Sequence, residues 1–323
     1  MSSAVVSYVV NGGPRAVTEE KVQRVRAAIE ELGYEPNSSA QALRTGRAPL
    51  IGLIIPDVRN QLIAELAHAV EAAAARSGFA VALANSNNDV GLEVGYSKSL
   101  SRMQPEGLIV GRLWSSHDLA PYRSAGRPVT FINEFREVKG FFSVAPDSYQ
   151  GAYLATSHLI DHGRNRVAIV TGDEAMISHR EDGWRAAVEE RGFSADGVFR
   201  TSFTYAGGYE AGKALLRSEQ RFDGVFAASD RMAIGVLHAL HEAGVRVPSD
   251  IAVASFDGTA EARYAWPSLT GSRQPLESMA AAAVASVLTG EPSTGRWLAP
   301  MTLTIGQSCG CVPARTDAIF DGL

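Results

Sequence analysis

The sequence predicts an α/β fold in which two lobes, each built on a doubly wound parallel sheet, follow a partial all-α segment. Its 323 residues exceed what one hydrophobic core usually supports, so more than one domain is expected. From residue 50 onward, apolar β-rich runs alternate with longer helical patterns, which is typical of buried parallel strands joined by right-handed crossovers. These predicted strands lie at 51–55, 79–84, 107–110, 129–132, 167–171, 224–227 and 251–255. Because there are more than six of them, two lobes are favoured.

The N-terminal part of the chain has a different, helical pattern. Residues 18–32 carry apolar side chains at helical spacing, with Thr18 as a candidate N-cap and Gly33 at the helix end. Residues 37–43 are a helix candidate too short to be stable alone, and the polar segment 44–47 follows it. This order indicates a small helical unit joined to the lobes by a hinge or linker.

The composition is that of an ordinary globular protein. Hydrophobic residues make up 46% and charged residues 20% of the chain, the mean hydropathy is −0.03, and no segment resembles a bilayer span. The apolar stretch at 4–10 has no basic leader, as a signal peptide would, so a cytoplasmic location is expected. A net charge of −5 does not indicate a nucleic-acid partner, so any case for DNA binding depends on motifs.

The chain has only two cysteines, Cys309 and Cys311, with one glycine between them. This spacing is poor for an ordinary structural disulfide, and the pair is two ligands short of a tetrahedral zinc site. We therefore expect reduced, non-catalytic thiols, with neither a metal nor a cofactor.

Two charged residues follow predicted strands, where open α/β sheets bind their ligands. Arg180 opens a helix after the run at 167–171, and Asp257 comes directly after the run at 251–255. With two lobes, facing strand ends form one cleft, in which a guanidinium fork and a carboxylate would bracket a polyol. The alternative is a structural ion pair, since such pairs also lie in clefts.

Several segments together resemble the LacI–GalR family of ligand-responsive transcription repressors. The opening at 2–12 is similar to the family's recognition helix and the turn after it, and 18–32 with the Gly-Tyr-Glu-Pro-Asn at 33–37 is similar to the third headpiece helix. The segment Ile-Gly-Leu-Ile-Ile-Pro-Asp at 51–57 resembles the first strand of the sensor core. The resemblance covers essentially the whole chain and implies a periplasmic-binding-protein-like core, a homodimer, operator DNA and a small effector, a sugar or alternatively a nucleoside.

The resemblance also implies a DNA-contacting set. On the recognition helix and its turn these are Ser2, Ser3, Ala4, Ser7, Tyr8 and Asn11, and on the hinge helix Asn37, Ala40, Leu43 and Arg44. Met1 falls where the family has the tight turn after its first helix, so the recognition helix is expected to lack its packing partner and to bind DNA poorly. The alternatives are a frayed N-terminal segment and a hinge leucine that packs on the core.

For the effector, the resemblance implies a set of residues at the strand ends: Leu62, Ile63, Asn133, Arg180, Trp184, Ser229, Asp230 and Asp257. Asn133 stands where many relatives have aspartate, and Ser229 where they often have asparagine. Leu62 and Ile63 replace residues that are commonly aromatic, which leaves less flat surface for stacking. Trp184 and Trp266 are candidate replacements, although a lone tryptophan is more often part of the core. Asp57, Asp147 and Gln274 match positions near the cleft and the lobe crossover, where a purely structural role is the alternative.

These features divide the chain into three parts. We expect a partial helix-turn-helix headpiece at 1–36, a hinge helix and linker at 37–49, and an effector-binding core at 50–323. Within the core, the first lobe spans about 50–145 and 274–300, and the second about 146–271 and 301–323.

The predicted function is that of a repressor that responds to a small polar molecule, with a stand-alone sugar sensor as the alternative if the headpiece does not work. An exported binding protein would need a signal peptide, for which the sequence gives no pattern. An enzyme is disfavoured because the sequence has no P-loop, no GxGxxG after its first strand, no GxSxG elbow and no histidine pair at metal spacing.

Overall fold

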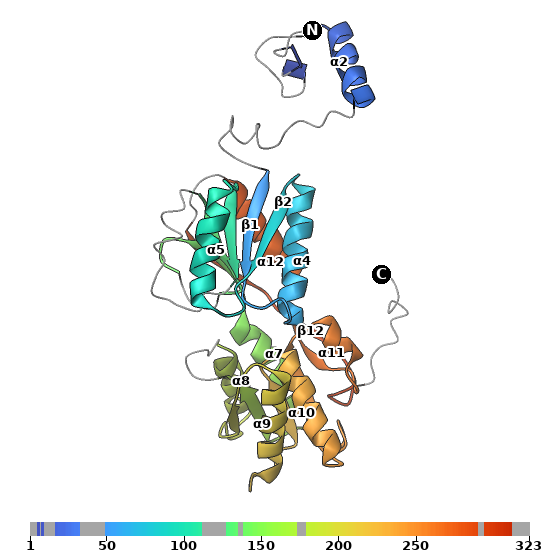
Figure 1. Cartoon of the computed structure of the whole chain (residues 1–323). Coiled ribbons are helices and arrows are strands. Elements are labelled where there is room, and N and C mark those ends of the chain that lie inside the picture. Colours follow the sequence, from blue (N-terminus) through green and yellow to red (C-terminus); the bar gives the residue numbers. More distant parts are fainter. Residues whose placement is uncertain are drawn as a thin grey trace.

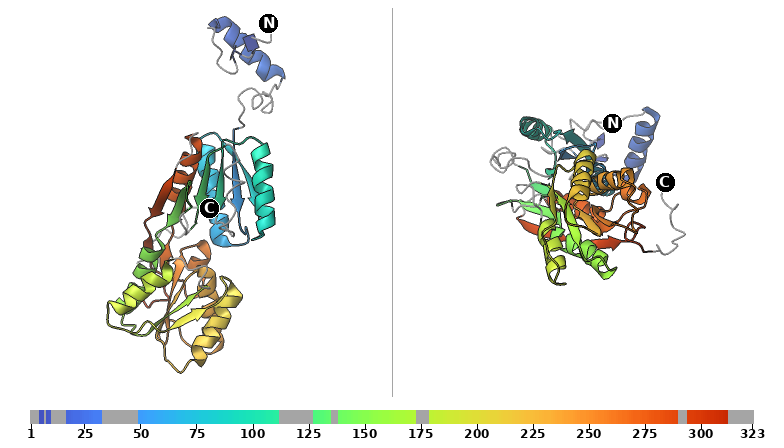
Figure 2. Two further views of the ribbon diagram at one scale, coloured as in Figure 1. Left: turned by 90° about the vertical axis from the view of Figure 1, so that its left-hand side faces the viewer. Right: turned by 90° about the horizontal axis from the view of Figure 1, so that it is seen from below.

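The computed structural model describes residues 5–6, 8–9, 17–32, 49–111, 127–134, 138–172, 179–289 and 294–311. Two lobes lie end to end, and α2 (Glu19–Leu32) belongs to the N-terminal part of the chain (Figures 1 and 2). Within the described residues, no helix is both long and apolar enough to cross a membrane.

The first lobe contains a six-stranded sheet in the order β11-β5-β4-β3-β1-β2, and all its strand pairs are parallel. The strands are β1 (Leu50–Ile55), β2 (Ala80–Asn85), β3 (Gly107–Gly111), β4 (Val129–Ile132), β5 (Phe142–Pro146) and β11 (Gly295–Ala299). Helices α4 (Gln61–Arg76) and α12 (Leu276–Leu288) cover one face with a shared apolar core, and α5 (Val90–Arg102) packs on the other. Burial on both faces explains why the inner strands β1, β3 and β4 are almost continuously apolar.

The second lobe repeats this plan with the sheet order β12-β10-β9-β8-β6-β7, in which only the β10–β12 pair is antiparallel. Its strands are β6 (Val167–Thr171), β7 (Val198–Arg200), β8 (Gly224–Ala227), β9 (Ala252–Asp257), β10 (Thr270–Arg273) and β12 (Thr302–Thr304). Helices α9 (Tyr205–Arg217) and α10 (Asp230–Glu242) pack on one face with the short α11 (Ala260–Tyr264), while α7 (Ser148–Asp161) and α8 (Arg180–Glu189) pack on the other.

The backbone passes between the lobes three times. The first passage lies between β5 and α7, the second between β10 and α12, and the third between β11 and β12. The first and third passages are hydrogen-bonded to each other, because the amide of Asp147 donates to the carbonyl oxygen of Ala299 at 2.9 Å. Asp147 also caps α7, since its carboxylate accepts from the amide of Gln150.

Helices that follow strands begin with polar caps, which brings side chains with oxygen atoms to the carboxyl ends of the sheets. Asn60 caps α4 after β1, and Ser229 caps α10 after β8, each by accepting a hydrogen bond from an amide two or three residues ahead. The local sequence therefore builds both the helix starts and the polar edge of each sheet.

The predicted fold class of two doubly wound α/β lobes is confirmed. The structure adds strands that the sequence analysis did not identify: β5, β7, β10, β11 and β12. They are short or polar, and β7, β11 and β12 lie at sheet edges, where the apolar pattern that identifies a buried strand is weakest. The predicted helix at 18–32 is present as α2, with the carbonyl oxygen of Thr18 accepting from the amides of Lys21 and Val22.

Candidate functional site

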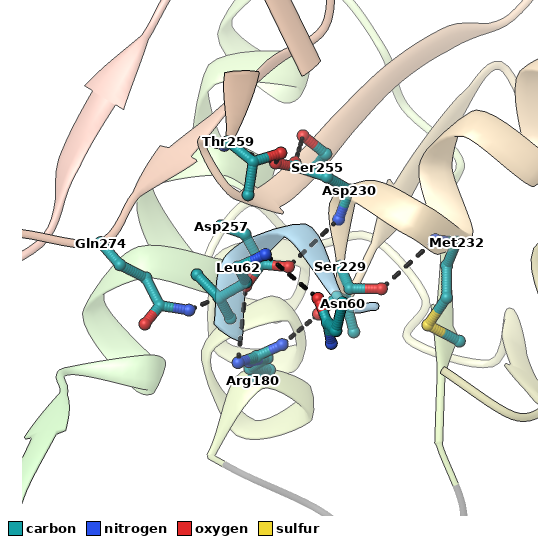
Figure 3. Close-up of polar contacts among 11 residues, drawn as sticks. Asn60, Leu62, Arg180, Ser229, Asp230, Met232, Ser255, Asp257, Thr259 and Gln274 are labelled. Atoms are coloured by element: carbon teal, nitrogen blue, oxygen red, sulfur yellow. Dashed lines mark hydrogen bonds and ion pairs between the residues drawn. The ribbon is translucent and has the colours of Figure 1, made fainter. Parts of the chain in front are cut away.

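The carboxyl ends of the strands carry a group of buried polar side chains. Arg180 begins α8, Ser229 and Asp230 begin α10, and Asp257 ends β9, all in the second lobe (Figure 3). Asn133 follows β4 in the first lobe. All five of these predicted residues are at most 6% exposed, so they are buried despite their polarity.

Arg180 is held by contacts of three kinds. Its Nη1 donates to the carbonyl oxygen of Ala228, and its Nη2 lies 3.9 Å from Oδ1 of Asp257. The guanidinium carbon lies 3.8 Å from the centroid of the Phe256 ring and 5.9 Å from that of Phe203. Aromatic faces attract a guanidinium, so these rings fix its plane and shield it from water.

Asp257 is the centre of the group (Figure 3). Besides facing Arg180, its carboxylate accepts hydrogen bonds from Nε2 of Gln274 at 2.8 Å and from the amide of Asp230 at 3.3 Å. Its φ of 125° lies in a region that non-glycine residues rarely adopt, and the next residue, Gly258, has a φ of 73°. Such backbone strain is found preferentially at ligand-binding positions.

Burial changes the protonation of this aspartate. It raises the pKa of Asp257 to about 7, with the nearby Asp230 adding to the shift and the charge of Arg180 opposing it. The carboxyl group therefore titrates near neutral pH, as is common at functional sites.

Asp230 holds the residues on either side of Asp257 in place. Its carboxylate accepts hydrogen bonds from Oγ of Ser255 at 2.6 Å and from the amide and Oγ1 of Thr259 at 2.7 and 2.8 Å. Burial raises the pKa of Asp230 to about 6, although these hydrogen bonds lower it. With its oxygens so engaged, Asp230 positions the chain around Asp257 rather than facing a cleft.

Two amide oxygens that follow strands, one in each lobe, are buried without a hydrogen-bond partner among the described residues: Oδ1 of Asn133 and Oε1 of Gln274. Asn133 has a φ of 58°, a left-handed conformation that asparagine tolerates well. Buried acceptors of this kind are rare and call for a donor from water or a ligand. The hydroxyl groups of a small polar molecule can supply such donors.

The lobes also touch beside this group. A pocket of about 640 Å³ lies between α4 and the second lobe, and Asp257 and Gln274 form part of its wall. Oε1 of Glu65 accepts a hydrogen bond at 2.9 Å from the amide of Ala260, the first residue of α11. Hydrogen bonds from Arg59 lower the pKa of Asp57, although burial opposes this. The charge of Arg231, which belongs to the second lobe, lowers it further.

Three residues of the predicted effector set lie outside this group. Leu62 and Ile63 belong to the apolar core of the first lobe. Trp184 is fully buried in the second lobe, and its Nε1 donates to the carbonyl oxygen of Val167, the first residue of β6. That contact lies at the end of β6 opposite the candidate site, so we do not retain Trp184 as a stacking surface. Trp266 is 88% exposed.

The rings that contact Arg180 were not predicted. Phe256 precedes Asp257 in β9, so it looks like an ordinary buried strand residue, and Phe203 lies in a loop before α9. The only sequence signal was an aromatic residue next to a predicted site residue.

Most of the predicted DNA-contacting residues fall outside the described part of the chain. Tyr8 is described and is helical and half-buried. The others, for which the structure gives no placement, are Ser2, Ser3, Ala4, Ser7, Asn11, Asn37, Ala40, Leu43 and Arg44.

Comparison with known proteins identifies the family. The model of bacterial regulatory proteins of the lacI family matches residues 1–37, and a periplasmic binding protein-like domain matches residues 156–309. Catabolite control protein A of Priestia megaterium is 31% identical over 291 residues, which cover 88% of this chain and 87% of that protein. The chain belongs to the LacI family. The ribose operon repressor of Escherichia coli K12 is 32% identical over 291 residues, with 88% of each chain covered.

Solved structures of transcription regulators share this fold. The lac repressor dimer bound to operator and the anti-inducer ONPF has a TM-score of 0.85 at 23% identity, with 96% of each chain covered. The transcriptional regulator CelR in complex with cellobiose has a TM-score of 0.73 at 27% identity, with 94% of each chain covered. Together with the relatives above, they identify this LacI-family chain as a ligand-responsive DNA-binding repressor rather than an enzyme.

Proposed function

We propose that the effector of this repressor is a sugar, held between the lobes by Arg180, Asp257, Asn133 and Gln274. The observation that carries the proposal is the Arg180–Asp257 pair, which is buried at the strand ends although its nearest N–O separation is 3.9 Å. That separation is too long for a direct hydrogen bond. A ligand hydroxyl group there would accept from the guanidinium and donate to the carboxylate.

The surrounding chemistry supports a polyol over an apolar ligand. The unpartnered acceptors on Asn133 and Gln274 call for donors, and the ring of Phe203 near Arg180 offers an apolar face for the carbon side of a sugar ring. Among relatives, one is named a ribose operon repressor and another was solved with cellobiose. A nucleoside would present the same ribose hydroxyl groups and is the competing ligand class.

We further propose that ligand binding changes the angle between the lobes and thereby the geometry of the hinge at 37–49, in a homodimer that acts on operator DNA in the cytoplasm. The DNA contacts proposed are those of the recognition helix (2–11) and of the hinge residues Asn37, Ala40, Leu43 and Arg44. A ligand shifts such an equilibrium only through its different affinity for the two arrangements. The headpiece, hinge and two-lobed core retain the boundaries 1–36, 37–49 and 50–323 in this proposal.

The test is a thermal-shift panel on the full chain with D-ribose, cellobiose, other mono- and disaccharides, nucleosides and amino acids. A ligand that binds only the folded state raises the melting temperature in a concentration-dependent way. We expect a hit among the sugars, with its affinity reduced at least ~10-fold in Arg180→Ala, because charged hydrogen bonds are lost. Arg191→Ala, which removes a surface arginine paired with Asp161, is the matched control and should bind normally.

Two results would overturn the assignment. If only amino acids or only nucleosides shift the melting temperature, the sugar proposal is wrong. If Arg180→Ala and Arg191→Ala bind the hit equally well, the ligand site lies elsewhere in the molecule.

A further inference from the structure

Four side chains with metal-binding atoms meet on the second lobe, away from the candidate effector site. His158 and His162 lie four positions apart at the end of α7, so helical geometry places them on one face. Cys309 and Cys311 lie on the segment after β12, separated by Gly310. The sequence analysis considered the two cysteines alone and found them two ligands short of a tetrahedral site. It was wrong to find no histidine pair at metal spacing, because His158 and His162 are four positions apart. The fold brings the two histidines to them.

The donor atoms are close to one another. Sγ of Cys311 lies 2.9 Å from Nε2 of His162 and 3.5 Å from Nε2 of His158. The donor atoms of His158, Cys309 and Cys311 all lie within 4.8 Å of one another, and the two imidazole centroids are 4.3 Å apart. In a tetrahedral zinc site, bonds of about 2.3 Å to sulfur and 2.0–2.1 Å to nitrogen place the ligands about 3.3–3.8 Å apart. His158, Cys309 and Cys311 lie near that geometry, and His162, which contacts the group through Cys311, would turn its ring toward the ion to complete it.

The side chains are also oriented for ligation. Nδ1 of His162 lies 2.9 Å from the carbonyl oxygen of His158, so a proton on Nδ1 leaves the lone pair of Nε2 directed at the sulfur. Zinc-bound histidines are held in this way, with the second ring nitrogen donating to a backbone carbonyl. Sγ of Cys309 accepts hydrogen bonds from Oγ1 of Thr270 at 3.0 Å and from the amide of Cys311 at 3.4 Å. Donors directed at a sulfur favour the thiolate, which is the form that binds metal.

The backbone of the cysteine segment fits this arrangement. Gly310 has a φ of 98°, a conformation that favours glycine, and it turns the chain between the two cysteines. Cys309 is buried in the core of the second lobe, whereas Cys311 is half-buried and His162 is exposed. The site is therefore anchored on the inside and reachable from solvent.

We propose that His158, His162, Cys309 and Cys311 form a tetrahedral binding site for Zn²⁺. Two thiolates and two imidazoles are a donor set that selects zinc among the common divalent ions. With four protein ligands the coordination is complete, so the site is structural rather than catalytic.

Zinc at this position would tie α7 to the segment that follows β12. Helix α7 begins directly after the first passage between the lobes, and β12 follows the third. The ion would thus hold together the two chain segments that enter the second lobe beside each other at Asp147 and Ala299. Zinc would stabilise the second lobe, because a ligand that binds the folded chain and not the unfolded chain raises the free energy of unfolding by mass action.

The experiment uses the full chain, treated with a chelator under reducing conditions and then titrated with Co²⁺. Tetrahedral cobalt gives intense visible absorption bands, and a thiolate ligand adds a near-ultraviolet charge-transfer band. We expect both, saturating at one Co²⁺ per chain and abolished by Zn²⁺. Zinc should also raise the melting temperature of the chelator-treated chain.

The informative variants are Cys311→Ser and His162→Ala, whose side chains are partly or fully accessible and whose loss should leave the lobe folded. Each should lower metal affinity by more than ~100-fold, the upper range for loss of a residue that only orients a ligand. Cys311→Ser should also reduce the thiolate band. His241→Ala changes a histidine in the last turn of α10 and is the matched control, expected to bind Co²⁺ like the native chain.

The proposal is overturned if the reduced chain shows no tetrahedral cobalt spectrum, or if His162→Ala and His241→Ala bind Co²⁺ equally well. It is also overturned if Cys309 and Cys311 form a disulfide whose reduction yields two thiols with no metal affinity. Thiol counting before and after reduction distinguishes this last result from the others.

Discussion

The guanidinium of Arg180 and the carboxylate of Asp257 face each other at 3.9 Å, and neither side chain is more than 6% exposed. Each is held by other groups: Arg180 by the carbonyl oxygen of Ala228 and the ring of Phe256, and Asp257 by Gln274. The pair is thus fixed in place without a direct hydrogen bond between its members. Rigid placement of a donor and an acceptor lowers the entropic cost of binding a small molecule between them.

Effector affinity should depend on pH through Asp257. The pKa of this carboxyl group is raised to about 7, and a ligand hydroxyl group donates a stronger hydrogen bond to the ionised form than to the neutral one. The apparent affinity should therefore fall as pH falls through 7, by up to about tenfold per pH unit, because the ionised fraction of Asp257 falls. It should reach a plateau above pH 8. Isothermal titration at pH 6, 7 and 8 measures this, with the effector found in the ligand panel.

Asp257→Asn is the control for that dependence. The amide does not titrate in this range, so the variant should bind more weakly and with a flat pH profile. A native profile that is already flat, or a variant that keeps the slope, assigns the titration to another group.

Asp230 should matter for stability more than its position in a binding site implies. Asp230→Ala leaves the hydroxyl of Ser255 and the amide and hydroxyl of Thr259 without their acceptor in a buried setting. The free energy of unfolding should fall by roughly 2–4 kcal/mol, since unsatisfied buried donors are costly. Urea unfolding measures it. The comparison is Asp250→Ala, which removes an exposed carboxylate paired with Arg246 and should have a much smaller effect. Equal losses would contradict the role given to Asp230.

Trp184 should act on stability alone. Trp184→Phe keeps an aromatic ring in the core but removes the hydrogen bond to the carbonyl oxygen of Val167. We expect a loss of about 1–2 kcal/mol in the free energy of unfolding, with effector affinity unchanged. Loss of affinity in a variant that unfolds normally would restore Trp184 as a ligand contact.

Asn133 combines a backbone and a side-chain role that two substitutions can separate. At a φ of 58°, alanine is strained by roughly 1–2 kcal/mol whereas glycine is not. Asn133→Ala should therefore be less stable than Asn133→Gly, as measured by chemical unfolding. Both should bind the effector more weakly than the native chain, because both lack the amide. If Asn133→Gly binds normally, the side chain does not contact the ligand.

The sequence was sufficient for the fold because most inner strands, such as β1 and β3, are apolar runs whose burial on both faces leaves a clear pattern. It was insufficient for three-residue strands such as β7 and β12, where the pattern is too short. Among the candidate site residues, Asp257 was predicted because it ends β9, and Arg180 because it opens the helix that follows β6. For Trp184 the sequence left a core position and a ligand contact open, because residue type and position along the chain do not show what its ring packs against, and the structure places the ring in the core of the second lobe.

The cluster of histidines and cysteines was not predicted for a different reason. His162 and Cys311 are 149 positions apart, on elements that each look ordinary alone. Only the folding of α7 against the segment after β12 brings them together. Spacing rules find ligands that are near one another in the sequence. They cannot find a site whose residues come from the first helix of a lobe and from the segment after its last strand.

The triple passage of the backbone restricts how the two halves of the sensor can move. Three covalent connections, of which the first and third are hydrogen-bonded to each other, oppose sliding and separation of the lobes, whereas small rotations of a few backbone dihedrals permit bending. Bending of this kind keeps the Arg180–Asp257 pair intact, because both residues belong to the same lobe. Opening would therefore release the ligand by moving the first lobe away from it, while Arg180 and Asp257 keep their arrangement in the second lobe.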